Sequence, residues 1–203
     1  MAGSFPVGGF ILVGGQSRRM GGEKALLELN GRPLALRAAE LLRPYVAEVT
    51  LLGSPERFGH LGLRIRADRQ PGRGPLEALC GALADSPCDW NIFLACDLPF
   101  LEEKFLEILV DQALAGQAQA VVPRTADGWQ PLCAAYHRSC VPAMEQALAR
   151  GSAGIVEILP ALQVDAIGSE ELARLGFSER LFRNINTPAD WDAAQRELEL
   201  TRR

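Results

Sequence analysis

The sequence predicts an α/β fold with a mostly parallel central sheet. Short β-like runs alternate with segments of helical periodicity along the 203 residues, and no internal repeat or low-complexity stretch interrupts them. A hydrophobic content of 48% is sufficient for one sizeable core. We therefore expect residues 1–203 to form a single domain.

Strands and helices alternate through the first hundred residues. The first strand is predicted at residues 10–13, and Pro33 is predicted to open the first helix. The apolar residues that share one face of this helix are Leu34, Ala38, Leu41, Leu42 and Tyr45. The elements that follow are strands at residues 49–52 and 63–67, a helix at 75–84 and a buried central strand at 90–95.

The second half continues the pattern with longer helices. A helix is predicted at residues 101–115, with Phe105, Leu109 and Ala113 facing the core. The remaining elements are strands at residues 120–122 and 132–136 and helices near 141–149, 155–159 and 188–200.

Composition excludes several classes of protein. A net charge of −4 and a pI near 5.3 give no electrostatic support for binding nucleic acid. The apolar stretches are far shorter than the roughly 18 residues that a membrane span needs, and the N-terminus lacks the features of a signal peptide. We expect a cytoplasmic protein. The five cysteines contain no C-x-x-C pair, so we expect inert thiols rather than a zinc site or disulfides.

A glycine-rich segment directly follows the first predicted strand. Residues 14–24 contain four glycines, the three cations Arg18, Arg19 and Lys24, and the single acid Glu23. Backbone N–H groups and cations together can replace the hydration shell of phosphate, so the segment predicts a cradle for a nucleoside triphosphate. A solvated turn is the alternative. The spacing fits neither a Walker A loop nor the G-x-G-x-x-G dinucleotide fingerprint.

Asp97 follows the predicted central strand. Ligands bind at the carboxyl ends of parallel strands, so Asp97 is expected to face the same cleft as residues 14–24. A carboxylate there suits Mg²⁺, which combines one or two carboxylates with phosphate oxygens and water. The alternative is that Asp97 caps the helix near Glu102.

These motifs resemble the nucleotidyltransferases that act on the molybdenum cofactor and related small phosphorylated acceptors. The L-x-G-G-x-S-x-R-M-G-x-x-K signature is matched by Leu12, Gly14, Gly15, Ser17, Arg19, Met20, Gly21 and Lys24. The other similar segments are C-D-x-P at 96–99, the loop from Asp68 to G-P-L at 74–76, P-L-x-A at 131–134 and N-x-N-T-P at 184–188. The sequence departs from the family at Val13, where alanine is usual, at Glu23, where aspartate is common, and at Glu77, where a small residue is usual. Glu77 can instead complement the dipole of its helix.

The resemblance implies a three-layer α/β/α Rossmann-like nucleotidyltransferase fold and the activity of the molybdenum cofactor guanylyltransferases. Residues 1–100 would then bind the nucleotide and residues 101–203 the acceptor. GMP would pass from GTP to the phosphate of molybdenum-bound molybdopterin, with Mg²⁺ as cofactor. Molybdoenzyme apoproteins or cofactor-delivery proteins would be further partners.

The resemblance also assigns roles to individual residues. The implied catalytic residues are Lys24, Arg19 and Asp97, with Asp97 as metal ligand and Asp68 as a second candidate. The implied nucleotide-binding residues are Leu12, Gly14, Gly15, Ser17, Gly21, Gly22, Lys24, Asp68, Gly74 and Asp97. Asn184 and Asn186 would bind the acceptor, because neutral amides add no negative charge beside Asp97.

Two other functions remain open from the sequence. One is the same chemistry with CTP on molybdopterin, or with another small phosphate as acceptor; only Asn184 and Asn186 argue against it, because related cytidylyltransferases tend to carry aspartates there. The other is a module that binds GTP or the cofactor without catalysis, which the departures at Val13 and Glu77 would favour.

Overall fold

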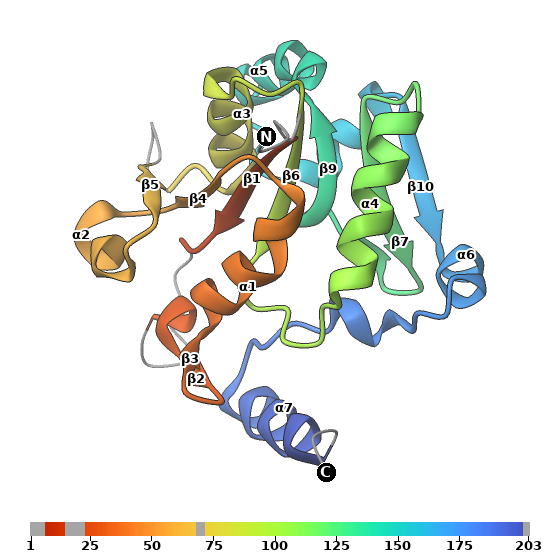
Figure 1. The fold of residues 1–203 in the computed structure, drawn as a ribbon. Coiled ribbons are helices and arrows are strands. Elements are labelled where there is room, and N and C mark those ends of the chain that lie inside the picture. The colour runs from red at the N-terminus through yellow and green to blue at the C-terminus, as the bar shows by residue number, and fades with distance from the viewer. Residues whose placement is uncertain (1–6, 15–22, 68–71, 201–203) are drawn as a thin grey trace, which may run out of the picture.

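The computed structural model describes residues 7–14, 23–67 and 72–200, and an eight-stranded sheet forms its centre (Figure 1). Across the sheet the strands are β10 (Val164–Gly168), β7 (Ala120–Thr125), β9 (Cys133–His137), β6 (Trp90–Ala95), β1 (Val7–Leu12), β4 (Val49–Leu52) and β5 (Arg64–Arg66). β8 (Gly128–Trp129) pairs only with β7.

Most of these strands run in one direction. β1 is parallel to both β4 and β6, β5 is parallel to β4, and β10 is parallel to β7. β9 is antiparallel to its neighbours β6 and β7. The predicted mostly parallel sheet is therefore confirmed.

Helices cover both faces of the sheet. α1 (Leu34–Leu42) and α4 (Glu103–Ala115) pack on one face, in a core cluster that includes Ile11 and Leu94. α3 (Pro75–Asp85) and α5 (Val141–Ala149) pack on the other, against a cluster that includes Phe10 and Phe93. Successive strand residues thus enter opposite clusters, as the strand period of two requires. The three-layer α/β/α arrangement is confirmed.

A third, smaller cluster lies outside the main layers. It joins Leu29, Leu34, Phe100, Ile185 and Ala194. These residues come from the hairpin of β2 (Glu28–Leu29) and β3 (Arg32–Pro33), from α1, from the segment after β6, from the segment before the last helix, and from that helix, α7 (Pro188–Leu200). Figure 1 shows α7 apart from the sheet, below α1. The cluster attaches the end of the chain to its first half.

Short elements complete the fold. They are α2 (Pro55–Phe58), α6 (Ser169–Arg174) and the 3₁₀ helices η1 (Lys24–Leu26), η2 (Arg43–Tyr45), η3 (Gly59–Leu61), η4 (Arg138–Cys140), η5 (Ile155–Ala161) and η6 (Glu179–Phe182). Among the described residues, no helix combines the length and the apolar character needed to cross a membrane.

The structure corrects several element predictions. β1 begins at Val7 rather than residue 10. Glycine ordinarily weakens a strand, but here the Asn91 side chain lies beside Gly8, with Oδ1 2.4 Å from where a Cβ would be. β7 continues through Pro123, beyond the predicted end at residue 122. Residues 155–159 belong to a 3₁₀ helix, which contains Pro160. β10 and α6 were not predicted; only one of the five β10 residues, Ile167, is buried, so this edge strand carries a weak hydrophobic pattern.

Four of the five cysteines are buried as free thiols, as expected. Burial raises the pKa of Cys140 to about 12, and it also raises the pKa values of Cys96 and Cys133. A raised pKa keeps a thiol protonated, which disfavours its use as a nucleophile.

Candidate active site

The predicted site residues lie where the central parallel strands end. Leu12, at the end of β1, is level with Ala95 of β6 and Leu52 of β4. Gly14 donates its N–H to Leu52 O at 3.2 Å, and Cys96 donates to Leu12 O at 3.3 Å. The segments that begin at Gly14 and at Cys96 therefore leave the sheet from the same edge.

Lys24 joins two of the other predicted residues. Its Nζ donates to Asp97 Oδ2 at 2.7 Å and to Asn186 Oδ1 at 2.9 Å. These partners are 73 and 162 residues away in the sequence. The Lys24 and Asp97 side chains are 17% and 13% exposed, so the ion pair is largely shielded from bulk water. The structure thus brings three predicted site residues together.

The Asp97 side chain faces Lys24 and does not cap the next helix. The N-cap position of α4 is held by Glu102, five residues later. The capping alternative is therefore wrong, since the chain passes through Pro99 and Phe100 before α4 begins at Glu103.

The C-terminal segment is anchored directly to Asp97. Ile185 donates its N–H to Asp97 O at 3.2 Å, and its side chain is buried in the third cluster. This contact holds the neighbouring Asn186 beside Lys24. Asn184 is exposed and forms no hydrogen bond with the described residues. The two predicted acceptor residues therefore have different surroundings.

The start of α7 fixes the same segment from the other side. Asp190 Oδ2 accepts hydrogen bonds from the N–H groups of Asn186 and Thr187 at 3.0 and 2.8 Å. Thr187 Oγ1 accepts from the N–H of Asp190 at 3.1 Å, so the cap is reciprocal. Hydrogen bonding, first to Thr187 and then to the Asn186 backbone, lowers the pKa of Asp190.

Gly74 is required by the fold itself. It occupies the N-cap of α3 with a φ of +85°, and a Cβ there would lie 2.9 Å from Ala153 O. The start of α3 is tied to the same place, because Leu76 donates its N–H to Ala153 O at 3.2 Å. The role of Gly74 in binding a nucleotide stays a prediction.

The two departures from the family pattern with structural consequences are both buried. Val13 is 5% exposed and belongs to the cluster beneath α1 and α4, where its Cγ2 would be 2.8 Å from a Cβ on Gly53. Glu77 lies in the first turn of α3 and is 7% exposed. Its Oε2 has no hydrogen-bond partner within the described ranges. Glu77 is thus placed to complement the helix dipole, but not as a solvated surface acid.

Several predicted residues lie outside the described residues. They are Gly15, Ser17, Arg19, Gly21, Gly22 and Asp68. Their predicted roles in binding phosphate and metal remain predictions.

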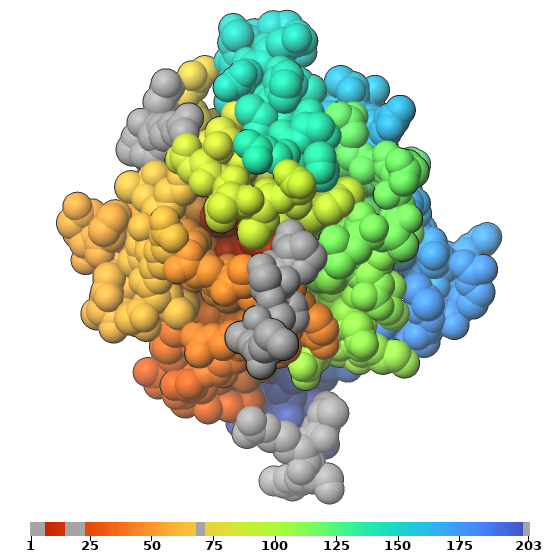
Figure 2. Space-filling view, turned by 45° about the horizontal axis from the view of Figure 1, so that its top comes forward, coloured from red at the N-terminus to blue at the C-terminus, as the bar shows by residue number. Residues whose placement is uncertain are grey.

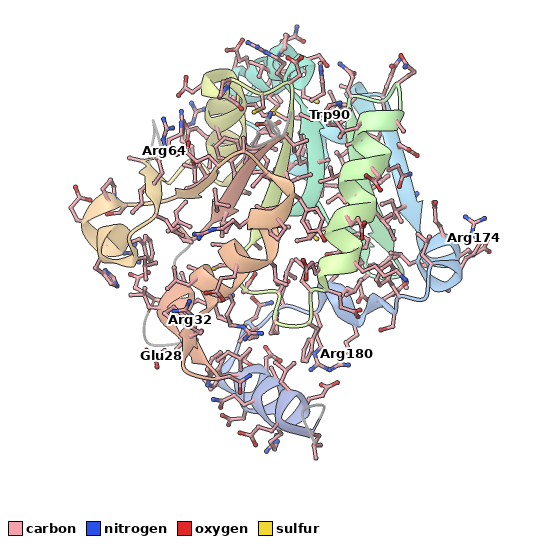
Figure 3. The ribbon with its side chains drawn as sticks, in the orientation of Figure 1. Glu28, Arg32, Arg64, Trp90, Arg174 and Arg180 are labelled. Atoms are coloured by element: carbon pink, nitrogen blue, oxygen red, sulfur yellow. The ribbon has the colours of Figure 1, made fainter. Side chains whose placement is uncertain are left out.

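One feature near the site was missed from the sequence. The guanidinium groups of Arg180 and Arg183 lie 4.3 and 4.2 Å from the centre of the Phe100 ring, and both side chains pair with Glu197 of α7. Figure 3 shows Arg180 close to α7. The sequence feature that could have predicted this cluster is the pair of arginines three residues apart, just before Asn184. The cluster links the segment after Asp97 to α7.

The predicted magnesium ion would depend on Asp97 and on oxygen atoms of the substrates. No group of three or more His, Cys, Asp or Glu side chains able to hold a metal occurs in the described part of the chain. Asp97 offers one carboxylate, and Mg²⁺ commonly takes one or two carboxylates together with phosphate oxygens and water. Asp97 is therefore the residue that would hold the ion.

Known proteins are similar to this chain over most of its length. Residues 9–166 match the model of the MobA-like NTP transferase domain. The chain is 37% identical over 183 residues to the "Probable molybdenum cofactor guanylyltransferase" of Pelotomaculum thermopropionicum, covering 90% of this chain and 88% of the relative. It is 33% identical over 199 residues to the "Molybdenum cofactor guanylyltransferase" of Serratia proteamaculans, covering 95% and 96%.

A solved structure supports the same relationship. The crystal structure of "Molybdopterin-guanine dinucleotide biosynthesis protein A" from Archaeoglobus fulgidus superimposes with a TM-score of 0.81 at 26% identity, covering 94% of this chain and 98% of that one. The family match spans most of the sequence and includes the strands that end at Leu12 and Ala95. The chain belongs to the family of MobA-like NTP transferase domains, and is a nucleotidyltransferase.

Proposed function

We propose that this protein transfers GMP from GTP to the phosphate of molybdenum-bound molybdopterin and releases pyrophosphate. The observation that carries the proposal is the contact of Lys24 with Asp97 and Asn186, in a chain whose relatives are named molybdenum cofactor guanylyltransferases. The contact joins the nucleotide loop, the end of β6 and the segment predicted to meet the acceptor.

Lys24 retains hydrogen-bonding capacity for a phosphate. An ammonium group has three donors, of which Asp97 and Asn186 take two. The third can bind a phosphate oxygen of the nucleotide. Two fixed partners orient the ammonium group before substrate arrives, so less ordering is needed when charge develops in the transition state.

The reaction is a direct displacement at phosphorus. An oxygen of the acceptor phosphate attacks the α-phosphorus of GTP, a new P–O bond forms, and the bond to the bridging oxygen breaks as pyrophosphate leaves. Lys24 and Arg19 offset the negative charge on the reacting phosphates. Magnesium, when bound at Asp97, supplies further positive charge between the two anionic substrates. No covalent intermediate with the protein is required.

Pyrophosphate release tests the proposal directly. Purified protein would receive magnesium and molybdenum-loaded molybdopterin, with GTP, CTP and ATP compared side by side. Release with GTP alone is the expected result. Release with CTP would support the mechanism but contradict the proposed specificity for guanine. GTP binding without release from any nucleotide would support a binding module instead.

The proposal also covers the proteins that receive the product and the compartment in which the enzyme acts. Molybdoenzyme apoproteins or cofactor-delivery proteins would take the guanine dinucleotide form of the cofactor in the cytoplasm. The single domain with a nucleotide half and an acceptor half also stays a prediction, and Lys24 to Asn186 is the contact that would join the two halves.

A further inference from the structure

A pocket of about 220 Å³ lies toward the opposite edge of the sheet from the Lys24 site. Its lining comes from the amino ends of β1 and β4, from β5, and from the segment that leads from α3 to β6. Figure 2 shows β1, in red, at the bottom of a hollow between the orange segment leading to β4 and the yellow-green end of α3. We call this hollow the amino-edge pocket.

Small residues keep the amino-edge pocket open. Gly8, Ala47 and Ala82 contribute to its lining without long side chains. At Gly81, one residue before Ala82, a Cβ would lie 2.7 Å from Arg66 Nη2. A larger residue at position 81 would therefore displace the Arg66 guanidinium from its place against the helix. These positions give the pocket a shape that larger residues would remove.

Two ion pairs supply the charge in the lining. Arg66 donates from Nε and Nη2 to Asp85 Oδ2 at 3.1 and 2.7 Å, and Arg64 donates to Glu48 Oε2 at 2.6 Å. Figure 3 shows Arg64 on β5, at the outer edge of the sheet. The Arg66 side chain is 16% exposed, and its Nη1 is buried without a hydrogen-bond partner in the described ranges. A buried donor left unpaired is costly, so it indicates a place for an acceptor.

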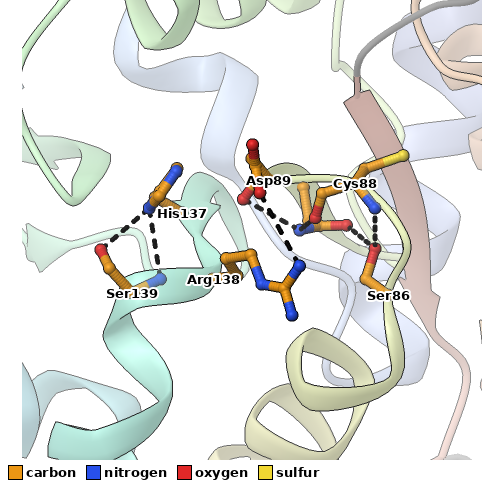
Figure 4. Close-up of polar contacts among 7 residues, drawn as sticks. Ser86, Cys88, Asp89, His137, Arg138 and Ser139 are labelled. Carbon is orange, nitrogen blue, oxygen red and sulfur yellow. Dashed lines mark hydrogen bonds and ion pairs between the residues drawn. The ribbon is translucent and has the colours of Figure 1, made fainter.

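Hydrogen bonds hold the rim of the pocket in place. Ser86 Oγ donates to Asn91 Oδ1 at 2.5 Å and accepts from Cys88 N at 3.2 Å, while Asn91 Nδ2 donates to Cys88 O at 3.1 Å (Figure 4). Ser86 and Asn91 are both buried. The rim is therefore formed before any ligand binds, which lowers the entropy cost of binding.

The balance of charge and apolar surface defines the ligand. Among the described residues of the lining, two guanidinium groups and two carboxylates are present, and their formal charges cancel. The two carboxylates would repel a dianion strongly. A monoanion would be repelled less and can accept a hydrogen bond from the unpaired N–H of Arg66. The walls contributed by Phe10, Ile65 and Ala82 are apolar. We propose that the amino-edge pocket binds a small monocarboxylate with a flat apolar body, whose carboxylate accepts hydrogen bonds from Arg66.

The geometry sets one condition on this binding. Nη1 is covered in the ligand-free pocket, so the guanidinium must turn to present it. The guanidinium fills the space beside Gly81, so the turn must carry it away from α3 and toward the pocket that Arg66 lines. The site is separate from the proposed nucleotidyl transfer and does not depend on it.

Cys88 provides a reporter for occupancy. It lines the pocket and is the one cysteine of five that is not buried. Burial raises its pKa, so alkylation with iodoacetamide is best followed at mildly alkaline pH. Benzoate is the probe. It should slow alkylation saturably with a dissociation constant on the order of a millimolar, as suits a ligand of this size.

Neutral and dianionic probes test the charge argument. Benzamide and phenyl phosphate have the same flat body, and each should bind at least about tenfold more weakly than benzoate, a difference of about one hydrogen bond to a charged group. Equal protection by benzoate and benzamide would overturn the role of Arg66. Protection by phenyl phosphate as strong as that by benzoate would overturn the preference for a monoanion.

Variants test the location. Ala47→Leu should fill the pocket and abolish protection, whereas Ala84→Leu, on the exposed surface of α3 outside the lining, should leave protection unchanged. Thermal stabilisation of each protein by benzoate provides a second measurement that does not involve Cys88. Absence of saturable protection in the wild type, or protection that survives in Ala47→Leu, would refute the proposal.

Discussion

The two edges of the sheet each carry an acid paired with a basic side chain, but the pairs are assembled from different distances along the chain. At the carboxyl edge, Lys24 reaches Asp97 and Asn186, which are 73 and 162 residues away. At the amino edge, Arg66 pairs with Asp85, only 19 residues away. The first contact forms only when both ends of the fold are in place. The second is made within one β-α unit.

The two edges also differ in the chemistry that their residues allow. The carboxyl edge holds a cation with a spare donor beside a carboxylate able to hold magnesium, which is what transfer between two anionic substrates needs. The amino edge holds a fixed rim and a balanced charge, which suits binding without chemistry. Helix α3 connects the two edges, since its N-cap is Gly74 and it ends at Asp85.

Loss of the Lys24 ammonium should have the largest effect. Lys24→Ala should lower kcat for pyrophosphate release by about a hundredfold to a thousandfold, the usual loss when one charge-stabilising donor is removed. The melting temperature should also fall, but moderately, because the substitution leaves the partly shielded Asp97 carboxylate without its cation. Steady-state kinetics and thermal unfolding measure the two effects.

Lys104→Ala is the matched control, since Lys104 is exposed on α4 and is the only other lysine of the chain. It should behave as the wild type. A Lys24→Ala protein with a wild-type kcat would show that the carboxyl-edge contact is not catalytic.

The two asparagines should differ. Asn186→Ala removes a hydrogen bond to a charged group, so kcat should fall roughly tenfold to a hundredfold. The Asn184 side chain forms no hydrogen bond with the described residues. Asn184→Ala should therefore raise KM for the acceptor with little change in kcat. Equal effects on kcat would contradict the view that Asn186 acts through Lys24.

Glu77 allows a test of α3 itself. Its Oε2 is buried without a partner among the described residues, whereas Asp85 at the other end of α3 is paired. The cost of the unpaired buried oxygen should exceed the gain from the helix dipole, so Glu77→Ala should stabilise the protein by about 1 kcal/mol, and Asp85→Ala should destabilise it. Denaturant unfolding measures both. A strongly destabilised Glu77→Ala protein would mean that the carboxyl group has a stabilising partner.

The sequence was most informative where a motif and a strand end coincide. Leu12, Gly14 and Asp97 could be placed because parallel strands present their carboxyl ends at one edge. The contact of Lys24 with Asn186 could not, since no local pattern connects residues 162 positions apart. The part of β7 from Pro123 to Thr125 was missed for a different reason: proline ordinarily marks the end of a strand, and here β7 continues beyond it.

The smallest expected effect concerns the cap that orients Asn186. The pKa of Asp190 is lowered, so its ionised form is favoured in the folded state, and the stability that it contributes is present above the unfolded pKa. This contribution should be lost as pH falls through the folded pKa, below the ordinary aspartate value of about 3.9. Asp190→Asn should therefore melt at a lower temperature than the wild type at neutral pH, and the difference should shrink in acid. Asp192→Asn, on the same helix, serves as control. If the difference between Asp190→Asn and the wild type stayed constant across this range, the carboxylate would not be the stabilising partner of Asn186 and Thr187, and the position of Asn186 at the carboxyl edge would depend on Ile185 and Lys24 alone.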